Sequence, residues 1–208
     1  MKRTFNHLSK EKRERIITAC IVEFGSHGYE RTTTDLLIRR IGISKGGLYE
    51  YISSKRELFL YVVEYTYARL YDYLRGRIRE GAGALPADIL ERVRLVSAYA
   101  IDFYIEHPEF ISFIVRTYQI SDDDLSRQVE TIFTKQYLDI FGDITSDPLR
   151  FGKERIIEML MWLLLKTRYS FLLELKSGKD VDTIRRDYMD NWEFYISIMK
   201  EGIYESNG

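Results

Sequence analysis

The residues best suited to carry chemistry lie at positions 32–58, where two short helical patterns flank Gly42. The second pattern opens with the letters SKGG at residues 44–47. A serine at this place caps a helix, and a lysine in the first helical turn can reach a guanine edge or a phosphate. The two glycines allow close approach of the backbone, and Gly42 can adopt the left-handed conformation of a turn. These features predict a helix-turn-helix whose second helix enters the major groove of DNA.

A catalytic or metal-binding constellation is not predicted elsewhere. The histidines are scattered along the chain: His7, His27 and His107. Glu154 and Glu158 lie one helical turn apart and are interpreted as a polar face or as an ion pair with Arg155. We therefore expect no enzyme activity, no metal and no cofactor.

The remaining pattern predicts an all-α chain. Of its 208 residues, 45% are hydrophobic and only 3 are proline, and no run shows the alternation of a strand. Caps, glycines and prolines place the longer helices at about 10–24, 54–79, 87–106, 109–118, from Ser121 to near Gly142, from Asp147 to 176, and 181–205. The first is expected to end in the GSHGY segment at residues 25–29, and the GAGALP break at 81–86 is the expected hinge between a head and a body.

The net charge of -1 conceals an asymmetry along the chain. Residues 1–60 hold 12 Lys+Arg against 7 Asp+Glu, whereas the remainder holds 19 against 25. A positive head on an acidic body favours counterion release at DNA phosphates. A solvated basic face is the alternative interpretation.

The cysteine content and the apolar runs bear on location. Cys20 is the single cysteine, so it cannot form an internal disulfide and is interpreted as a small buried hydrophobe. Residues 1–15 lack the apolar core of a signal peptide, and the most apolar run, residues 159–165, is too short to span a bilayer. We expect a cytoplasmic protein with no membrane partner.

The N-terminal segment resembles the DNA-binding head of the TetR family of bacterial transcriptional regulators. The matching positions are Phe24, Gly28, Tyr29, Thr33, Thr34, Leu37, Gly42, Ile43, Ser44, Lys45, Gly46, Leu48, Tyr49, Tyr51, Lys55 and Leu58. They cover about a quarter of the chain without a gap, which makes the resemblance specific. It implies a three-helix DNA-binding head at residues 1–54 and a larger helical body at residues 55–208 that binds an effector and forms a dimer.

Four positions depart from the usual pattern of this family. Ile38 and Ile41 stand where alanines are usual, so the two short helices must cross slightly differently or further apart within the same fold. Ile52 stands where phenylalanine is usual, a change between apolar residues that keeps this position in the core. Glu50 on the second short helix repels phosphate but can accept from a cytosine amine. It bears on base preference more than on binding itself.

The residues expected to contact DNA are Thr33, Thr34, Ser44, Lys45, Gly46, Gly47, Tyr49, Tyr51 and Lys55. Lys45 is the main candidate, and the resemblance implies that Tyr49 offers its hydroxyl to a phosphate. Alternatives remain for several of them. The glycines can serve tight helix packing, Thr33 and Thr34 are helix-cap residues first, and Tyr51 can stay half packed.

In the body, aromatic residues are dense enough to line a pocket for an apolar or aromatic effector, although a plain hydrophobic core is the more common explanation. The candidate effector residues are Tyr99, Phe103, Phe113, Arg116, Tyr137, Trp162 and Tyr169. Arg116 and Arg168 can orient an anionic ligand, or they can be exposed or salt-bridged.

The last two helices carry more apolar surface than a monomer core needs, so we expect them to pair with a second copy. The candidate interface residues are Ile157, Leu160, Met161, Leu164, Trp192, Tyr195 and Met199. The combined expectation is a homodimeric repressor that binds a palindromic double-stranded operator and is released by a small-molecule effector. The alternatives are a helical protein that binds small molecules or lipids, and a DNA-organising protein without a ligand response.

Overall fold

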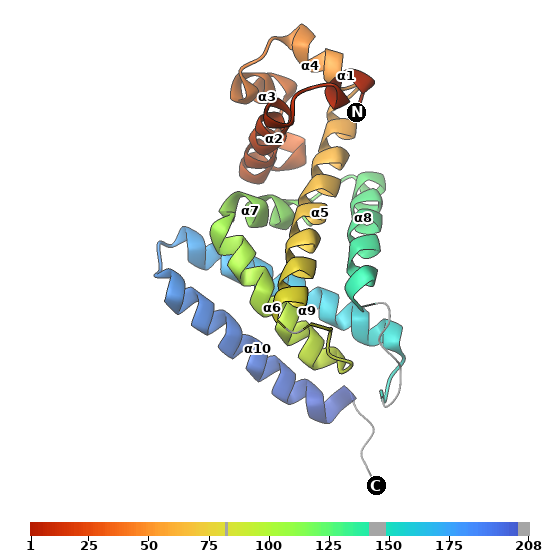
Figure 1. Cartoon of the computed structure of the whole chain (residues 1–208), viewed down its shortest axis with the longest axis vertical. Coiled ribbons are helices and arrows are strands. Elements are labelled where there is room, and N and C mark those ends of the chain that lie inside the picture. The colour runs from red at the N-terminus through yellow and green to blue at the C-terminus, as the bar shows by residue number, and fades with distance from the viewer. Residues whose placement is uncertain (82, 142–148, 204–208) are drawn as a thin grey trace. The chain divides into compact units, whose positions relative to one another are not determined.

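The computed structural model describes residues 1–81, 83–141 and 149–203 of the chain (Figure 1). Every element in this described part is an α-helix, which confirms the predicted all-α fold. The helices are α1 (Arg3–Asn6), α2 (Lys10–Arg31), α3 (Thr34–Ile41), α4 (Lys45–Tyr51), α5 (Lys55–Gly81), α6 (Ile89–Glu106), α7 (Pro108–Thr117), α8 (Asp123–Phe141), α9 (Lys153–Lys176) and α10 (Val181–Ile203).

The described chain divides into two compact units. The first unit holds residues 1–69 and 109–136, and the second holds residues 70–108, 137–141 and 149–203. Two helices, α5 and α8, therefore contribute residues to both units. The functional division into residues 1–54 and 55–208 remains a prediction, because compactness groups α7 and most of α8 with the helix-turn-helix.

The first unit is built around α2 and the beginning of α5. Phe24 of α2 packs edge-on against Phe59 of α5, with ring centroids 4.9 Å apart, and both contact Phe113 of α7. The helix α2 continues through Gly25 to a break at Gly28, where φ is +76°; this break lies inside the segment 25–29 in which the end was expected. A Cβ at Gly25 would lie 3.1 Å from the Phe113 backbone nitrogen, so this glycine permits the close approach of α7.

The second unit has an aromatic core. Phe171 of α9 contacts Tyr104 of α6 and Tyr188 of α10, with ring centroids 6.1 and 5.7 Å apart, and Phe103 lies 5.3 Å from Tyr73 of α5. The last helix, α10, packs along both α6 and α9 (Figure 1). A short turn at residues 177–180 connects α9 to α10, so these two helices are antiparallel neighbours.

Several helix ends differ from the sequence-based expectation. The cap of α8 is the Asp122 carboxylate, which accepts from the Leu125 N–H at 2.8 Å, and not Ser121. The helix expected from Asp147 begins at Lys153 as α9; residues 142–148, with the expected end and start, lie outside the described residues. The short helix α1 was not expected at all. No helix in the described ranges is long and apolar enough to cross a membrane.

Candidate nucleic-acid interface

The turn between α3 and α4 forms as the sequence predicts. Thr33 caps α3 by accepting from the Leu36 N–H at 3.2 Å, and Ser44 caps α4 by accepting from the Gly47 N–H at 3.1 Å. Gly42 lies between them at φ 75° and ψ 40°, the left-handed conformation that ends α3. These local hydrogen bonds fix where α4 begins and leave its N-terminal end at the surface.

One face of α4 is buried and the other is open. Leu48 is fully packed into the first unit, whereas Lys45, Gly46, Tyr49 and Glu50 are exposed. At about 100° per residue, these four positions fall within an arc of about 140°, so they lie on one side of the helix. The open face therefore combines one cation, one hydroxyl and one carboxylate with a stretch of bare backbone. This combination suits contacts to phosphates and base edges in a groove.

The two glycines of α4 have different roles. A Cβ at Gly47 would lie 3.3 Å from the Ser44 Oγ, so a side chain there would crowd the capping hydroxyl. A Cβ at Gly46 would meet no described atom within 4 Å. The internal packing of the described protein thus explains Gly47 but does not require glycine at position 46.

Lys55 is tied into the protein itself. Its ammonium donates to the carbonyl oxygens of Tyr29 at 2.9 Å and Thr32 at 3.1 Å, and it lies 4.2 Å from the centre of the Tyr29 ring. Burial lowers the pKa of the Lys55 ammonium. The side chain therefore joins the C-terminal end of α2 to the start of α5, which sequence reasoning did not anticipate.

The remaining predicted DNA contacts have mixed environments. Thr33 is exposed beside its capping role, and Thr34 is half-buried at the start of α3. Tyr51 is half-buried, packs on Phe5 with ring centroids 6.1 Å apart, and has the Lys12 ammonium 6.0 Å from its ring centre. The structure therefore brings Ser44, Lys45, Gly46 and Tyr49 to one surface and leaves Tyr51 partly enclosed.

A buried carboxylate connects α2 to α3. Glu23 of α2 is buried, accepts from Arg40 of α3 at 2.9 Å, and lies 3.3 Å from the His27 imidazole. Both partners are partly open to solvent, so the carboxylate keeps some contact with polar surroundings. The Glu23–Arg40 ion pair links α2 to α3, and its two residues are too far apart in the sequence for their spacing to have suggested it.

A second support of α4 was also missed. Residues 2–6 lie against the C-terminal end of this helix, with Phe5 completely buried. The single sequence signal was an apolar Phe5 in an otherwise polar N-terminal stretch. That signal gives no indication of which surface the residue covers.

The candidate effector residues do not form one group. Phe113 and Arg116 belong to the first unit: Phe113 packs between Phe24 and Phe59, and Arg116 donates to Gln119 at 2.7 Å and to the carbonyl oxygens of Gly25 and Ser26 at 3.4 Å. The other five, from Tyr99 to Tyr169, belong to the second unit.

Within the second unit these five residues have different surroundings. Phe103 and Tyr137 are buried, the latter stacked on Phe141 with ring centroids 4.3 Å apart, and burial raises the pKa of the Tyr137 hydroxyl. Tyr99 is half-buried beneath the Arg77 guanidinium. Trp162 and Tyr169 are instead 67% and 41% exposed on α9, because their face of the helix is not covered within the protomer.

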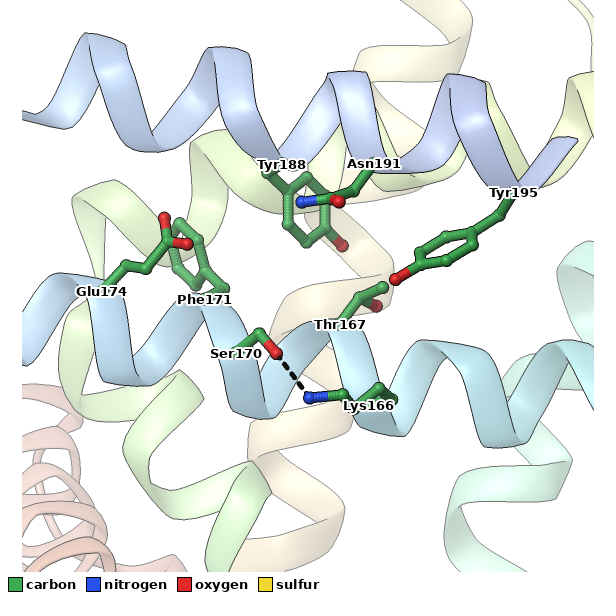
Figure 2. Close-up of a pocket in the computed structure, with 8 residues that line it drawn as sticks. All are labelled: Lys166, Thr167, Ser170, Phe171, Glu174, Tyr188, Asn191 and Tyr195. Atoms are coloured by element: carbon green, nitrogen blue, oxygen red, sulfur yellow. Dashed lines mark hydrogen bonds between the residues drawn. The ribbon is translucent and has the colours of Figure 1, made fainter. Parts of the chain in front are cut away.

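An open groove of about 180 Å³ runs between α9 and α10 (Figure 2). Phe171 and Tyr188 form part of its wall, and the Lys166 ammonium donates to the Ser170 hydroxyl at 3.1 Å beside it. Tyr195, a candidate interface residue, extends from α10 into the same groove.

The other candidate interface residues fall into two sets. Leu160, Leu164 and Trp192 are buried within the protomer and have almost no surface left for a partner. The half-buried residues are Ile157, Met161, Tyr195 and Met199.

The capped turn, the exposed α4 face and the all-helical body define a helix-turn-helix DNA-binding protein. Residues 16–62 match the family model described as "Bacterial regulatory proteins, tetR family". Residues 16–62 are therefore a TetR-type helix-turn-helix DNA-binding domain, and the chain as a whole shares the fold of TetR-type regulators.

Two curated relatives carry the likeness beyond the head. The HTH-type transcriptional regulator YerO of Bacillus subtilis is 33% identical over 101 residues, which is 49% of this chain and 34% of YerO. The aligned region thus spans about a third of that relative. The nucleoid occlusion factor SlmA of Mannheimia succiniciproducens is 25% identical over 181 residues, 86% of this chain and 79% of SlmA.

Two solved structures share the fold. A TetR family regulator from Chloroflexus aurantiacus superposes with a TM-score of 0.68 at 18% identity, covering 99% of both chains. FadR from Bacillus subtilis in complex with stearoyl-CoA superposes with a TM-score of 0.67 at 15% identity, covering 86% of this chain and 96% of FadR.

Proposed function

We propose that the chain is a homodimeric repressor in the cytoplasm that leaves a near-palindromic operator when a small apolar or aromatic effector binds. The observation that carries this proposal is the open face of α4, with Lys45 exposed in its first turn behind the Ser44 cap. Two such faces, one from each copy, dock in successive major grooves of a two-fold symmetric site.

The DNA-binding half of the proposal is supported by charge and shape. Lys45 supplies an exposed cation, and Gly46 offers backbone without a side chain at a position where the described packing does not require glycine. The test is selection of bound duplexes from a random pool, followed by gel shifts at several salt concentrations. A specific site is expected to show a steep salt dependence, and equal affinity for selected and random duplexes would refute the proposal.

The dimer is supported by an uncovered apolar stripe. On α9 the exposed apolar residues are Met159, Trp162, Tyr169 and Leu173, and on α10 they include Phe194 and Ile198. Intervals of three, four and seven residues put each set on one helix face. We therefore assign Trp162 and Tyr169 to the dimer face instead of the effector pocket, with the same two helices of a second copy as the partner.

The effector half is supported by the aromatic core of the second unit. Phe103 and Tyr104 of α6 and Tyr137 of α8 are buried aromatic residues, the type of side chain that lines pockets for apolar ligands. FadR, which shares the fold, was crystallised with stearoyl-CoA, so long-chain acyl compounds are the first probes to use. Thermal-shift measurements with these probes, followed by gel shifts, test both binding and release.

A route for coupling is supported by the helices that belong to both units. The α7–α8 corner is bound to the head through Arg56, which pairs with Asp122 at 3.2 Å, and through Glu30, which accepts from the Ser121 N–H at 2.9 Å. An effector that prefers the conformation with unsuitably spaced heads shifts the population away from the DNA-bound state. A compound that binds without changing operator affinity would contradict this coupling.

A second candidate function follows from the likeness to SlmA. We keep open a DNA-organising role, in which the same dimer binds many chromosomal sites and no ligand releases it. Mapping of bound sites separates the two: a regulator occupies a few promoters, whereas an organiser occupies sites spread over the chromosome.

A further inference from the structure

We propose that the N-terminal arm, residues 2–6, is a positioning element that sets the angle of α4 and thereby its DNA selectivity. This inference rests on the proposed DNA-binding function and adds residues that lie outside the helix-turn-helix. The arm lies beside the C-terminal end of α4 (Figure 1).

The arm satisfies the end of α4. A helix leaves its last four carbonyl groups without intrahelical partners. In α4, the Leu48 carbonyl accepts from the Ile52 N–H at 3.2 Å, which leaves the carbonyls of residues 49–51. The Lys2 ammonium donates to the Tyr49 oxygen at 2.7 Å, the Thr4 hydroxyl donates to the Glu50 oxygen, and the Lys2 N–H donates to the Tyr51 oxygen at 2.9 Å.

An aromatic anchor holds the arm in place. Phe5 is completely buried, and its ring contacts Tyr51 of α4 at 6.1 Å and Tyr61 of α5 at 5.4 Å between centroids. Because Phe5 contacts both helices, it fixes α4 relative to α5. Isolated helices as short as the seven residues of α4 are not stable in water, so the angle of α4 depends on such external contacts.

The same contacts distinguish positioning from direct DNA contact. The groups of Lys2 and Thr4 that face α4 are engaged with its carbonyl oxygens, whereas Arg3 is exposed on the same arm. A positioning role acts on the fit of the α4 face to base edges and leaves the number of neutralised phosphates unchanged. Loss of this positioning should therefore lower the affinity for the specific site without changing the salt dependence of binding.

The experiment uses the full-length protein with Phe5→Ala, Thr4→Val and Arg3→Gln, and measures affinity for a selected duplex and for random duplex at several salt concentrations. Phe5→Ala is expected to weaken specific binding about tenfold or more, and Thr4→Val a few-fold, since each removes packing or one hydrogen bond. Random-DNA affinity and the salt slope stay at wild-type values, and Arg3→Gln leaves both the specificity ratio and the slope unchanged. Phe5→Leu, which refills the site, recovers most of the specific affinity.

Amide hydrogen exchange on the free protein keeps the test independent of global folding. In Phe5→Ala, exchange of the amides of residues 48–52 is expected to accelerate about tenfold while the α5 amides keep their protection. If Arg3→Gln reduced the slope of log affinity against log salt concentration by about one, the proposal would be overturned, because the arm would then contact a phosphate itself. Unchanged specific binding by Phe5→Ala would also overturn it, whereas a wild-type protein without duplex preference would refute the proposed function.

Discussion

Removal of Trp162 tests the proposed dimer most directly. Its side chain is 67% exposed, so of the roughly 250 Å² that a large aromatic can bury, about 170 Å² is open in the protomer. At about 25 cal/mol per Å², complete coverage by a partner is worth about 4 kcal/mol per copy. With half coverage the gain is about 2 kcal/mol, and a symmetric interface counts it twice, which gives about 4 kcal/mol per dimer.

This magnitude sets a clear expectation for Trp162→Ala. Because 1.4 kcal/mol corresponds to a tenfold change, the dimer dissociation constant should rise about a thousandfold. Sedimentation equilibrium over a series of protein concentrations measures this constant. The monomer fold should be retained, as judged by circular dichroism, since the side chain contributes little to the protomer core.

The matched control is Tyr49→Ala, which removes an exposed aromatic from α4 and should leave the dissociation constant unchanged. Equal dissociation constants for wild type and Trp162→Ala would refute the reasoning that the uncovered α9 stripe is the dimer face. An equal loss in both variants would show that the effect is not specific to this stripe.

Three further predictions concern the head. Lys45→Ala should weaken operator binding by about 1–3 kcal/mol at an unchanged melting temperature, because the side chain is exposed; normal gel-shift affinity of the folded variant would remove its role. Lys55→Met should lower the free energy of unfolding, measured by chemical denaturation, by about 1 kcal/mol, because the carbonyls of Tyr29 and Thr32 lose a charged donor. Unaltered stability together with weaker DNA binding would indicate that Lys55 contacts a phosphate instead. Burial raises the pKa of the Cys20 thiol to about 12, so the reactive thiolate is nearly absent at pH 8. An aromatic disulfide reagent should therefore label Cys20 only after the protein unfolds. Rapid labelling of the native protein would contradict the burial of this thiol.

The parts of the head that could be predicted from sequence are those that depend on neighbouring residues. Caps at Thr33 and Ser44 and the left-handed Gly42 each involve hydrogen bonds within about four residues of the chain. The position of a helix cap can therefore be predicted from a short stretch of sequence.

Features that depend on distant partners could not be predicted in this way. Gly25 has the residue type of a helix end, yet it serves the approach of Phe113, which lies almost ninety residues further along the chain. Lys55 has the charge of a phosphate ligand, yet its donors are used by the carbonyls of Tyr29 and Thr32. Residue type indicates what such a side chain can do, but the tertiary partner decides which role it takes.

The body illustrates a second limit. The sequence indicates an excess of apolar residues on the last two helices, and helical periodicity groups them into stripes. Periodicity does not say which stripe faces inward: Leu160, Leu164 and Trp192 are covered within the protomer, while Trp162 and Phe194 remain open. That choice depends on where α6 packs against α10, a contact between helices far apart in sequence.

Selectivity in such a head is distributed over more residues than touch DNA. The side chains of the α4 face carry the chemistry, but seven residues are too few to maintain a helix of fixed direction. Buried Leu48 packs α4 into the first unit, and the Ser44 hydroxyl caps its first turn. Its final carbonyls accept hydrogen bonds from Lys2 and Thr4. Substitutions at these supports should lower the preference for the selected sequence, as substitutions of base-contacting side chains on the open face do, whereas the loss of a phosphate contact should weaken binding to every duplex.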